Sequence, residues 1–154
     1  MKTVDELIAH CQKAIEGNWQ YVYGGKGKKL SKDQILNLQK QYGKKLVPDT
    51  DLQKAGKICC DCSGLISSLV GGQNFKNTAW FRNNALESKP ISERDSSMKG
   101  WAVYMQGHIG VYDGNDGYYA MDGSERNMVH KNLSQNKFTE IIKLSDIKYD
   151  KYDK

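Results

Sequence analysis

The sequence has no long hydrophobic run. Charged residues stand at Lys2, Asp5 and Glu6, so no apolar stretch of signal-peptide length opens the chain. No later run approaches the roughly 20 apolar residues that a membrane-spanning helix requires. We therefore expect no membrane insertion, and a protein that is cytosolic, leaves its cell by other means, or is one domain of a longer chain.

Cysteine is scarce and poorly placed for disulfide bonds. Three of the four cysteines, Cys59, Cys60 and Cys62, crowd into four positions and cannot all bridge without strain. Cys59 and Cys62 spell C-x-x-C, but a zinc site would need a second closely spaced Cys/His pair, and the sequence has none. A thioredoxin-like dithiol would need a βαβ surround, whereas the predicted strands follow the motif. We expect reduced thiols, no metal and no cofactor.

The rest of the composition is typical of one globular domain. The chain has 154 residues, 27% of them charged and 38% hydrophobic, which is enough for a buried core. Its formal net charge of +5 favours binding to an anionic surface but does not indicate whether that surface is nucleic acid, phospholipid or a wall polymer. The lysines between Lys26 and Lys45 alternate with polar rather than aromatic residues, which favours a solvated insertion over residues 26–56 above a polyanion-binding face. We expect a monomer without a nucleic-acid partner.

The spacing of apolar residues predicts helices first and strands afterwards. Thr3 and Glu6 are placed to form a capping box on the first helix, and Gly114 to Gly117 are typical of a hairpin turn. The predicted helices cover residues 4–16, 31–42, 62–70 and 78–86, and the predicted strands cover residues 101–104, 108–112, 117–121, the region of 129, and 138–144. This order indicates an α+β fold over residues 1–148, with 149–154 as a charged tail.

Cys62 stands where a nucleophile is readily activated. A helix N-terminus favours negative charge, so a thiol at that position is expected to have a lowered pKa. Asp61 is placed to cap the helix, and Ser63 and Gly64 are small enough for a substrate backbone to approach. The amide of Cys62 itself is positioned to donate to an oxyanion. These features favour a nucleophile over a buried structural cysteine.

A cysteine nucleophile needs a histidine held on a rigid element opposite it. Of the three histidines, His108 alone lies in a predicted strand. His10 is on the first helix and His130 in a predicted loop, both in polar surroundings, so neither is a candidate. We expect Cys62 to be the nucleophile and His108 its general base.

These segments resemble motifs of the NlpC/P60 family of papain-like cell-wall peptidases. Residues 61–66 are similar to the family's D-C-S-G-[LIV]-[VI] motif, and residues 107–114 to its G-H-[VI]-G-[IV]-Y-x-G strand. Residues 21–25 resemble the upstream Y-x-[WY]-G-G element, and 26–56 are longer than in the shortest members. The resemblance implies a papain-like fold, with N-terminal helices packed on a central antiparallel sheet.

The same resemblance implies a reaction and a set of binding residues. It implies hydrolysis of the γ-D-glutamyl to diamino-acid bond of peptidoglycan stem peptides, through a thioester and an oxyanion intermediate. It places Tyr21 or Tyr23, with Asp61, Ser63 and Gly107, against the stem peptide. It also implies action at the bacterial cell wall, for example as a bacteriolytic phage endolysin.

The third catalytic position departs from the family pattern. Many members carry a His or another polar group about twelve residues after the strand histidine, and here that position is Ala120, which cannot orient an imidazole. Asp122 lies on the same face of a continuing strand, and its carboxylate could fix the tautomer of His108. The alternatives are a backbone carbonyl or water, and Asn127. We expect Asp122 to complete the triad.

Two other functions stay open on the sequence. The same Cys–His pair would serve an N-acetylmuramoyl-L-alanine amidase, or an acyltransferase or deamidase acting on a protein. Because Ala120 replaces the usual polar group, a catalytically degenerate module that binds wall fragments is the remaining alternative.

Overall fold

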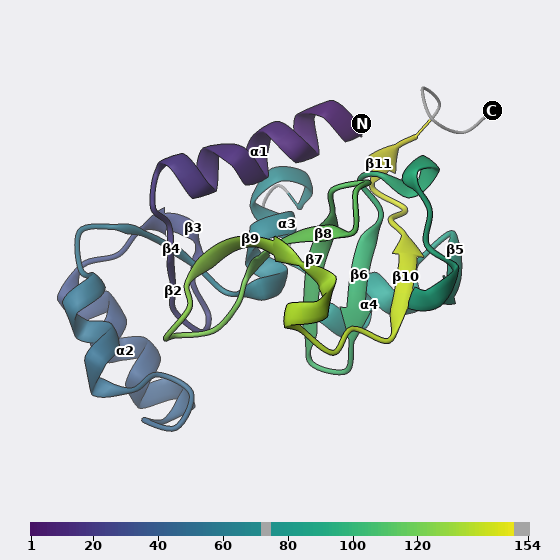
Figure 1. Cartoon of the computed structure of the whole chain (residues 1–154). Coiled ribbons are helices and arrows are strands. Elements are labelled where there is room, and N and C mark those ends of the chain that lie inside the picture. Colours follow the sequence, from purple (N-terminus) through teal and green to yellow (C-terminus); the bar gives the residue numbers. More distant parts are fainter. Residues whose placement is uncertain (72–74, 150–154) are drawn as a thin grey trace.

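A six-stranded antiparallel sheet forms the centre of the protein (Figure 1), shown by a computed structural model that describes residues 1–71 and 75–149. The strand order is β5–β10–β6–β7–β8–β9. The strands are β5 (Glu87–Pro90), β6 (Ala102–Met105), β7 (His108–Tyr112), β8 (Gly117–Met121), β9 (Met128–Asn132) and β10 (Glu140–Lys143). This confirms the predicted α+β class. β5 was not predicted, because its mostly exposed polar residues show no alternation of apolar side chains.

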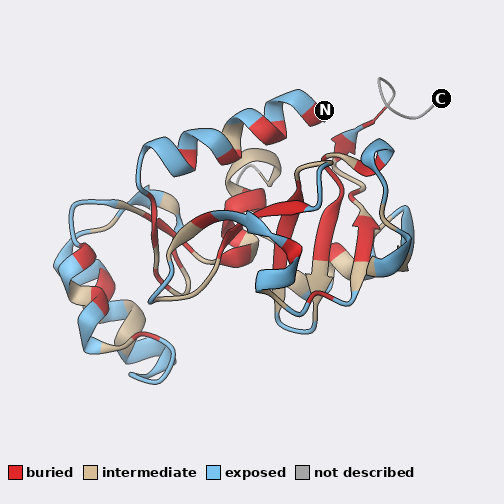
Figure 2. Cartoon of the chain, in the orientation of Figure 1, coloured by how far each residue is buried: buried red, intermediate tan, exposed pale blue. Residues whose placement is uncertain are grey.

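The capping box predicted at the start of the first helix is present. Helix α1 (Val4–Glu16) begins with the capping box of Thr3 and Glu6, which satisfies two otherwise unpaired backbone N–H groups. Its apolar side, including Leu7 and Cys11, is buried, and the helix packs on α3 (Cys62–Val70) and β9. Figure 2 shows the buried and exposed sides of α1 alternating along its length.

Helix α3 carries Cys62 against the sheet. It begins at Cys62 as predicted, ends before Gly71, and packs against β7 and β8. The close contact of α3 with the turn at Gly25 and with the strand before Cys62 depends on two glycines. A Cβ on Gly64 would lie 2.8 Å from the Gly25 carbonyl oxygen, and one on Gly25 would lie 2.9 Å from the Cys59 carbonyl oxygen. The turn at Gly25, the strand before Cys62 and the helix after it are therefore in direct backbone contact.

A smaller sheet lies beside α3. It consists of β2 (Gln20–Tyr21), β4 (Ile58–Cys60) and β3 (Lys26–Lys29), with β2 parallel and β3 antiparallel to β4. Helix α2 (Lys32–Tyr42) and the 3₁₀ helix Asp49–Lys54 complete residues 26–56, and α2 lies at the opposite end of the molecule from β5 and β10 (Figure 1). A small core of Val22, Ile35, Val47 and Cys59 holds this part together. The predicted insertion thus has apolar packing of its own.

The remaining elements close the domain. Helix α4 (Thr78–Asn83) is shorter than predicted, and β1 (Lys2–Thr3) pairs in parallel with β11 (Ile147–Lys148). Of the predicted tail, only Tyr149 lies within the described residues. Within residues 1–71 and 75–149, no helix combines the length and the hydropathy needed to cross a membrane.

Candidate active site

Cys62 is the first residue of α3. Asp61 caps this helix, as predicted, by accepting a hydrogen bond from the Gly64 amide at 2.7 Å. The Cys62 sulfur lies 3.9 Å from the carbonyl oxygen of Gly107, the residue that precedes β7. The packing of α3 on β7 therefore brings the predicted nucleophile to the start of the strand that bears His108.

The acidity of the Cys62 thiol differs from the expectation. Burial, together with the negative charge of Asp61, raises the pKa of Cys62 to about 11. The backbone N–H groups of Ile109, Ser63 and Cys62 lower this pKa, but by less than burial raises it. The prediction of a lowered pKa at the helix start is therefore wrong, because it considered the helix terminus and not the desolvation of the sulfur. Thiolate formation at neutral pH requires a proton acceptor beside Cys62.

His108 is suited to be that acceptor. Its Nε2 lies 2.7 Å from the Asp122 carboxylate, and its ring stacks on Phe138 with centroids 5.3 Å apart. An ionised carboxylate only accepts hydrogen bonds, so Nε2 carries the proton and Nδ1 of the neutral ring is left as a base. The Cys62 sulfur lies next to the carbonyl group of Gly107, and the backbone N–H of Ile109 lowers its pKa. Gly107 and Ile109 are the residues directly before and after His108 in the chain.

The register of the β7–β8 hairpin explains why Asp122 and not Ala120 meets His108. Val111 pairs with Tyr119, and continuing this register places Asp122 opposite His108 and Ala120 opposite Gly110. Ala120 is completely buried. The alternative Asn127 lies elsewhere, since its side-chain oxygen accepts a hydrogen bond from the Tyr21 amide at 3.0 Å.

Asp122 is surrounded by hydrogen-bond donors. Besides His108, its carboxylate accepts from the Tyr118 hydroxyl and the Asn136 amide, each at 2.9 Å, and pairs with Arg126 at 3.0 Å. Burial alone would raise its pKa, but the hydrogen bonds from His108 and Tyr118 and the charges of His108 and Arg126 together lower it. The carboxylate is therefore held ionised, with only 3% of the side chain exposed.

These three supporting residues were not predicted from the sequence. Tyr118 lies in β8, four positions before Asp122, which directly follows that strand, so the alternation of side chains along a continuing strand is a signal for it. Arg126 lies four positions after Asp122 in a loop, and Asn136 follows β9, where no local pattern points to the site.

A groove with a volume of about 340 Å³ opens at Cys62. It is lined by every predicted substrate-binding residue, namely Tyr21, Tyr23, Asp61, Ser63 and Gly107, whereas His108 and Asp122 are not among its lining residues. Its lining also includes residues that were not predicted, among them Lys26, Tyr42, Phe75 and Lys76. The segment of Tyr21 and Tyr23, the segment around Cys62, and Gly107 at the start of the strand of His108 therefore meet at one groove on the surface.

Two of the predicted binding residues are already engaged within the protein. The Asp61 carboxylate accepts from the Gly24 amide at 3.1 Å as well as from Gly64, and the Ser63 hydroxyl donates to it at 3.3 Å. Burial raises the pKa of Asp61, while these hydrogen bonds oppose the rise. Asp61 thus joins the turn at Gly24 to α3, which is a structural role beside any contact with substrate.

The other cysteines lie away from the groove. All four cysteines are free thiols. Cys59 packs in the small core with its sulfur 3.3 Å from the Lys57 carbonyl oxygen, and Cys60 packs in the main core. The two sulfurs of the C-x-x-C sequence, those of Cys59 and Cys62, therefore have different surroundings. In the part of the chain that the structure describes, no group of three or more His, Cys, Asp or Glu side chains could hold a metal ion.

The other histidines have structural partners. His10 Nε2 lies 3.0 Å from the Leu65 carbonyl oxygen and 2.8 Å from the Ser68 hydroxyl. His130 lies in strand β9, so its assignment to a loop was wrong, and its Nε2 lies 2.8 Å from Asp113.

We expect His108→Ala to slow alkylation of Cys62 at pH 7 by at least about tenfold. Because burial raises the pKa of this thiol to about 11, its reaction near neutral pH depends on a base that takes the thiol proton, and the variant lacks the candidate base. Iodoacetamide labelling followed by mass spectrometry of the Cys62 peptide measures the rate, which in the variant should keep rising with pH up to about 11. His130→Ala is the matched control and should label like the unmodified protein. Equal rates for His108→Ala and the unmodified protein would show that His108 does not accept the thiol proton.

Comparisons with known proteins agree with this geometry at the level of the fold. No family model and no curated protein matches the sequence. The structure is similar to the crystal structure of the P60 domain of an antigen from M. avium subspecies paratuberculosis, with a TM-score of 0.54. The match covers 93% of this chain and 97% of that domain at 17% sequence identity. The chain therefore has the fold of a P60 domain.

Proposed function

We propose that this protein is a cysteine peptidase of the NlpC/P60 type that hydrolyses peptidoglycan stem peptides. The observation that carries the proposal is the arrangement of Cys62, His108 and Asp122 where α3 packs on β7. The Cys62 sulfur packs beside the first residues of β7, and the His108 ring on that strand is held through Nε2 by Asp122 at 2.7 Å. This arrangement supports the roles of nucleophile, base and orienting group that acyl transfer by a cysteine uses.

The reaction uses these groups in sequence. His108 Nδ1 takes the thiol proton, and the Cys62 sulfur attacks the scissile carbonyl carbon to give a tetrahedral oxyanion. The Cys62 amide, at the N-terminus of α3, donates to that oxyanion. The oxyanion collapses to a thioester as the C–N bond breaks, and the leaving amine takes the proton from His108. A water molecule, deprotonated by His108, then hydrolyses the thioester and restores the thiol.

The charge of the groove supports an anionic peptide substrate. Lys26 begins β3 opposite Cys60, and its ammonium lies 5.5 Å from the centroid of the Phe75 ring. The other groove lysine, Lys76, pairs with Asp146 at 2.8 Å, whereas no described carboxylate forms an ion pair with Lys26. A stem glutamate linked through its γ-carboxyl keeps a free α-carboxylate. We propose Lys26 as the cation that binds this carboxylate.

The completed network around Asp122 favours catalysis over wall binding by a degenerate module. Ala120 cannot orient His108, but Asp122 occupies the position opposite the histidine and is held ionised. We place the activity at the bacterial cell wall, with residues 1–148 as the catalytic domain, as in a phage endolysin or an exported wall enzyme.

Muropeptide analysis tests the bond that is cleaved. We expect a digest of purified cell walls to contain new free amines on the diamino acid and disaccharides that still carry L-Ala-D-Glu, measured by liquid chromatography and mass spectrometry. An endopeptidase splits the stem internally, whereas an amidase separates the intact stem from the lactyl group. Release of whole stem peptides would assign the same dyad to an amidase, and an unchanged digest would contradict both enzyme assignments.

A further inference from the structure

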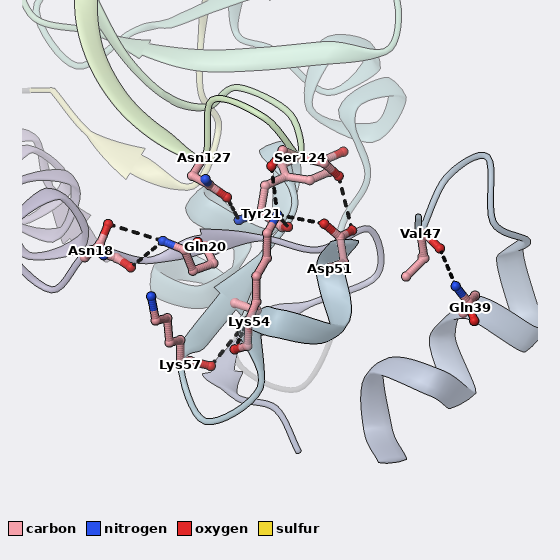
Figure 3. A network of polar contacts seen from close by, with 11 residues as sticks. Asn18, Gln20, Tyr21, Gln39, Val47, Asp51, Lys54, Lys57, Ser124 and Asn127 are labelled. Atoms are coloured by element: carbon pink, nitrogen blue, oxygen red, sulfur yellow. Dashed lines mark hydrogen bonds and ion pairs between the residues drawn. The ribbon is translucent and has the colours of Figure 1, made fainter. Parts of the chain in front are cut away.

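A buried lysine connects residues 26–56 to both sides of the candidate site. Lys54 ends the 3₁₀ helix Asp49–Lys54, and its ammonium has three oxygen neighbours. These are the Asp51 carboxylate at 2.8 Å, the Tyr21 carbonyl at 2.7 Å and the Ser124 carbonyl at 2.9 Å. Figure 3 shows the Lys54 side chain extending to the place where Tyr21, Asp51 and Ser124 meet. The ammonium thus donates hydrogen bonds to the two carbonyl oxygens and forms an ion pair with the carboxylate.

This cluster is almost dry. The Asp51 side chain has no exposed surface and that of Lys54 is 10% exposed. The Ser124 hydroxyl donates to the second carboxylate oxygen of Asp51 at 3.1 Å. The ion pair therefore has hydrogen-bonded neighbours on both charged groups, which a buried pair needs.

The two carbonyl groups bound by Lys54 belong to segments that form the site. Tyr21 lines the groove and its amide donates to the Asn127 side chain at 3.0 Å. Ser124 and Asn127 lie in the loop that follows Asp122, and this loop is closed by hydrogen bonds from the Asp122 amide to the Asn127 carbonyl and from the Asn127 amide to the Gly123 carbonyl, each at 2.8 Å. Lys54 therefore joins the tyrosine side of the groove to the loop that begins at the carboxylate holding His108.

Stability by itself does not account for an ion pair at this place. Removing two charges from water costs as much as their attraction returns, and apolar residues of similar volume often stabilise a fold equally well. Apolar side chains would fill the space between Asp51 and Ser124, but they would not bind the carbonyl groups of Tyr21 and Ser124. What the ammonium adds is a fixed distance between those two segments.

We propose that Lys54 is a positioning residue for the catalytic pair, one that sets His108 against Cys62 by holding the Tyr21 strand and the 123–127 loop together. This inference rests on the proposed function, since it assigns residues 26–56 a part in the same chemistry. Loss of the tether would let Asp122 and the attached imidazole shift relative to the sulfur, and displacements of about 1 Å can slow catalysis by about 100-fold.

The test replaces the charged pair by an apolar one. The double variant Asp51→Leu/Lys54→Met avoids the uncompensated buried carboxylate that Lys54→Met alone would leave. We expect it to fold with a Tm close to that of the unmodified protein. Its Cys62 should be alkylated about fivefold more slowly at pH 7, with a pH profile displaced towards that of His108→Ala. Hydrolysis of purified walls should fall by about tenfold or more, in kcat rather than KM.

The matched control removes a different ion pair that also joins distant elements. Arg82 of α4 binds Glu140 of β10 through two hydrogen bonds of 2.8 and 2.9 Å, and neither residue lines the groove. Arg82→Met/Glu140→Leu should keep the alkylation profile and the activity of the unmodified protein. Normal alkylation and activity in Asp51→Leu/Lys54→Met would overturn the proposal, as would equal losses in both double variants.

A second variant and a substrate-free measurement keep the result decisive. If the apolar pair does not fold, Asp51→Asn/Lys54→Gln supplies a neutral pair that can hydrogen-bond but cannot reach all three oxygens, and the same losses are expected. Alkylation of Cys62 requires no peptidoglycan, so it reports on positioning even if wall hydrolysis is never observed. A slow alkylation with no wall hydrolysis in any protein would retain the positioning role and reject the proposed substrate.

Discussion

Cys62→Ala is expected to abolish hydrolysis of purified peptidoglycan while the protein stays folded. In the proposed mechanism the sulfur supplies the attacking electron pair, and an alanine side chain has no atom that can take its place. Removal of the nucleophile from a group that acts as a unit leaves only binding and oxyanion stabilisation, so the rate should fall by about 10³-fold or more. Release of dye from labelled cell walls measures the loss.

The stability of this variant should change little. Cys62 is small, and truncation to alanine removes a single heavy atom, for which a cost of about 1 kcal/mol is typical. Cys59→Ala is the matched control, because Cys59 is also buried and lies three positions away but packs in the small core. It should retain full activity with a similar Tm. Wall hydrolysis by Cys62→Ala at the unmodified rate would exclude the proposed mechanism.

Asp122→Asn is expected to lower kcat by about 10³- to 10⁴-fold. The carboxylate accepts the Nε2–H of His108 at 2.7 Å and so leaves Nδ1 free to take the Cys62 proton. An amide at this position can present its NH₂ group to the ring, which favours the tautomer that carries its proton on Nδ1. The imidazolium formed during the reaction also loses the negative charge that stabilises it. Steady-state kinetics on cell walls, with Cys62 alkylation at pH 7 as a second readout, measure both effects.

The same residue links stability to pH. The pKa of Asp122 is lowered in the folded protein, so its ionised form contributes stability above the unfolded pKa, and this contribution is lost as the pH falls through the lowered folded value. Asp122→Asn should therefore flatten the acid side of the stability curve, measured by thermal unfolding at a series of pH values. The neutral amide has no corresponding proton to bind.

Asp113→Asn is the control for a histidine–aspartate pair as such. Asp113, which follows β7, lies 2.8 Å from Nε2 of His130 in β9, and although burial raises the pKa of Asp113, hydrogen bonds, chiefly from His130, lower it overall. This pair has the same chemistry as His108–Asp122 but no cysteine beside it. Asp113→Asn should leave kcat unchanged, and a comparable loss of activity in both variants would indicate a general effect on the fold.

Residues near one another in the chain were sufficient to predict much of the framework. The capping box of Thr3 and Glu6, the cap of Asp61 on α3, and the hairpin turn from Gly114 to Gly117 all depend on contacts within a few positions. Such contacts form wherever the local sequence permits, so the pattern alone placed Cys62 at a helix start and His108 on a strand. Asp122 was the leading candidate for the third position because it lies on the same face of the continuing strand as Ala120, and the register of the hairpin places it opposite His108.

Tertiary packing decided the properties of those groups. Burial of the Cys62 sulfur raises its pKa to about 11, whereas the helix start by itself predicted a lowered value. Asn136 reaches Asp122 from beyond β9, and Lys54 reaches Tyr21 and Ser124 from the predicted insertion. Desolvation and long-range hydrogen bonds depend on which surfaces meet, and no spacing within one segment encodes that. Spacing within single segments was thus enough to nominate Cys62, His108 and Asp122 as candidate catalytic side chains, whereas the packing of α3, β7 and residues 26–56 sets their burial and their hydrogen-bond partners.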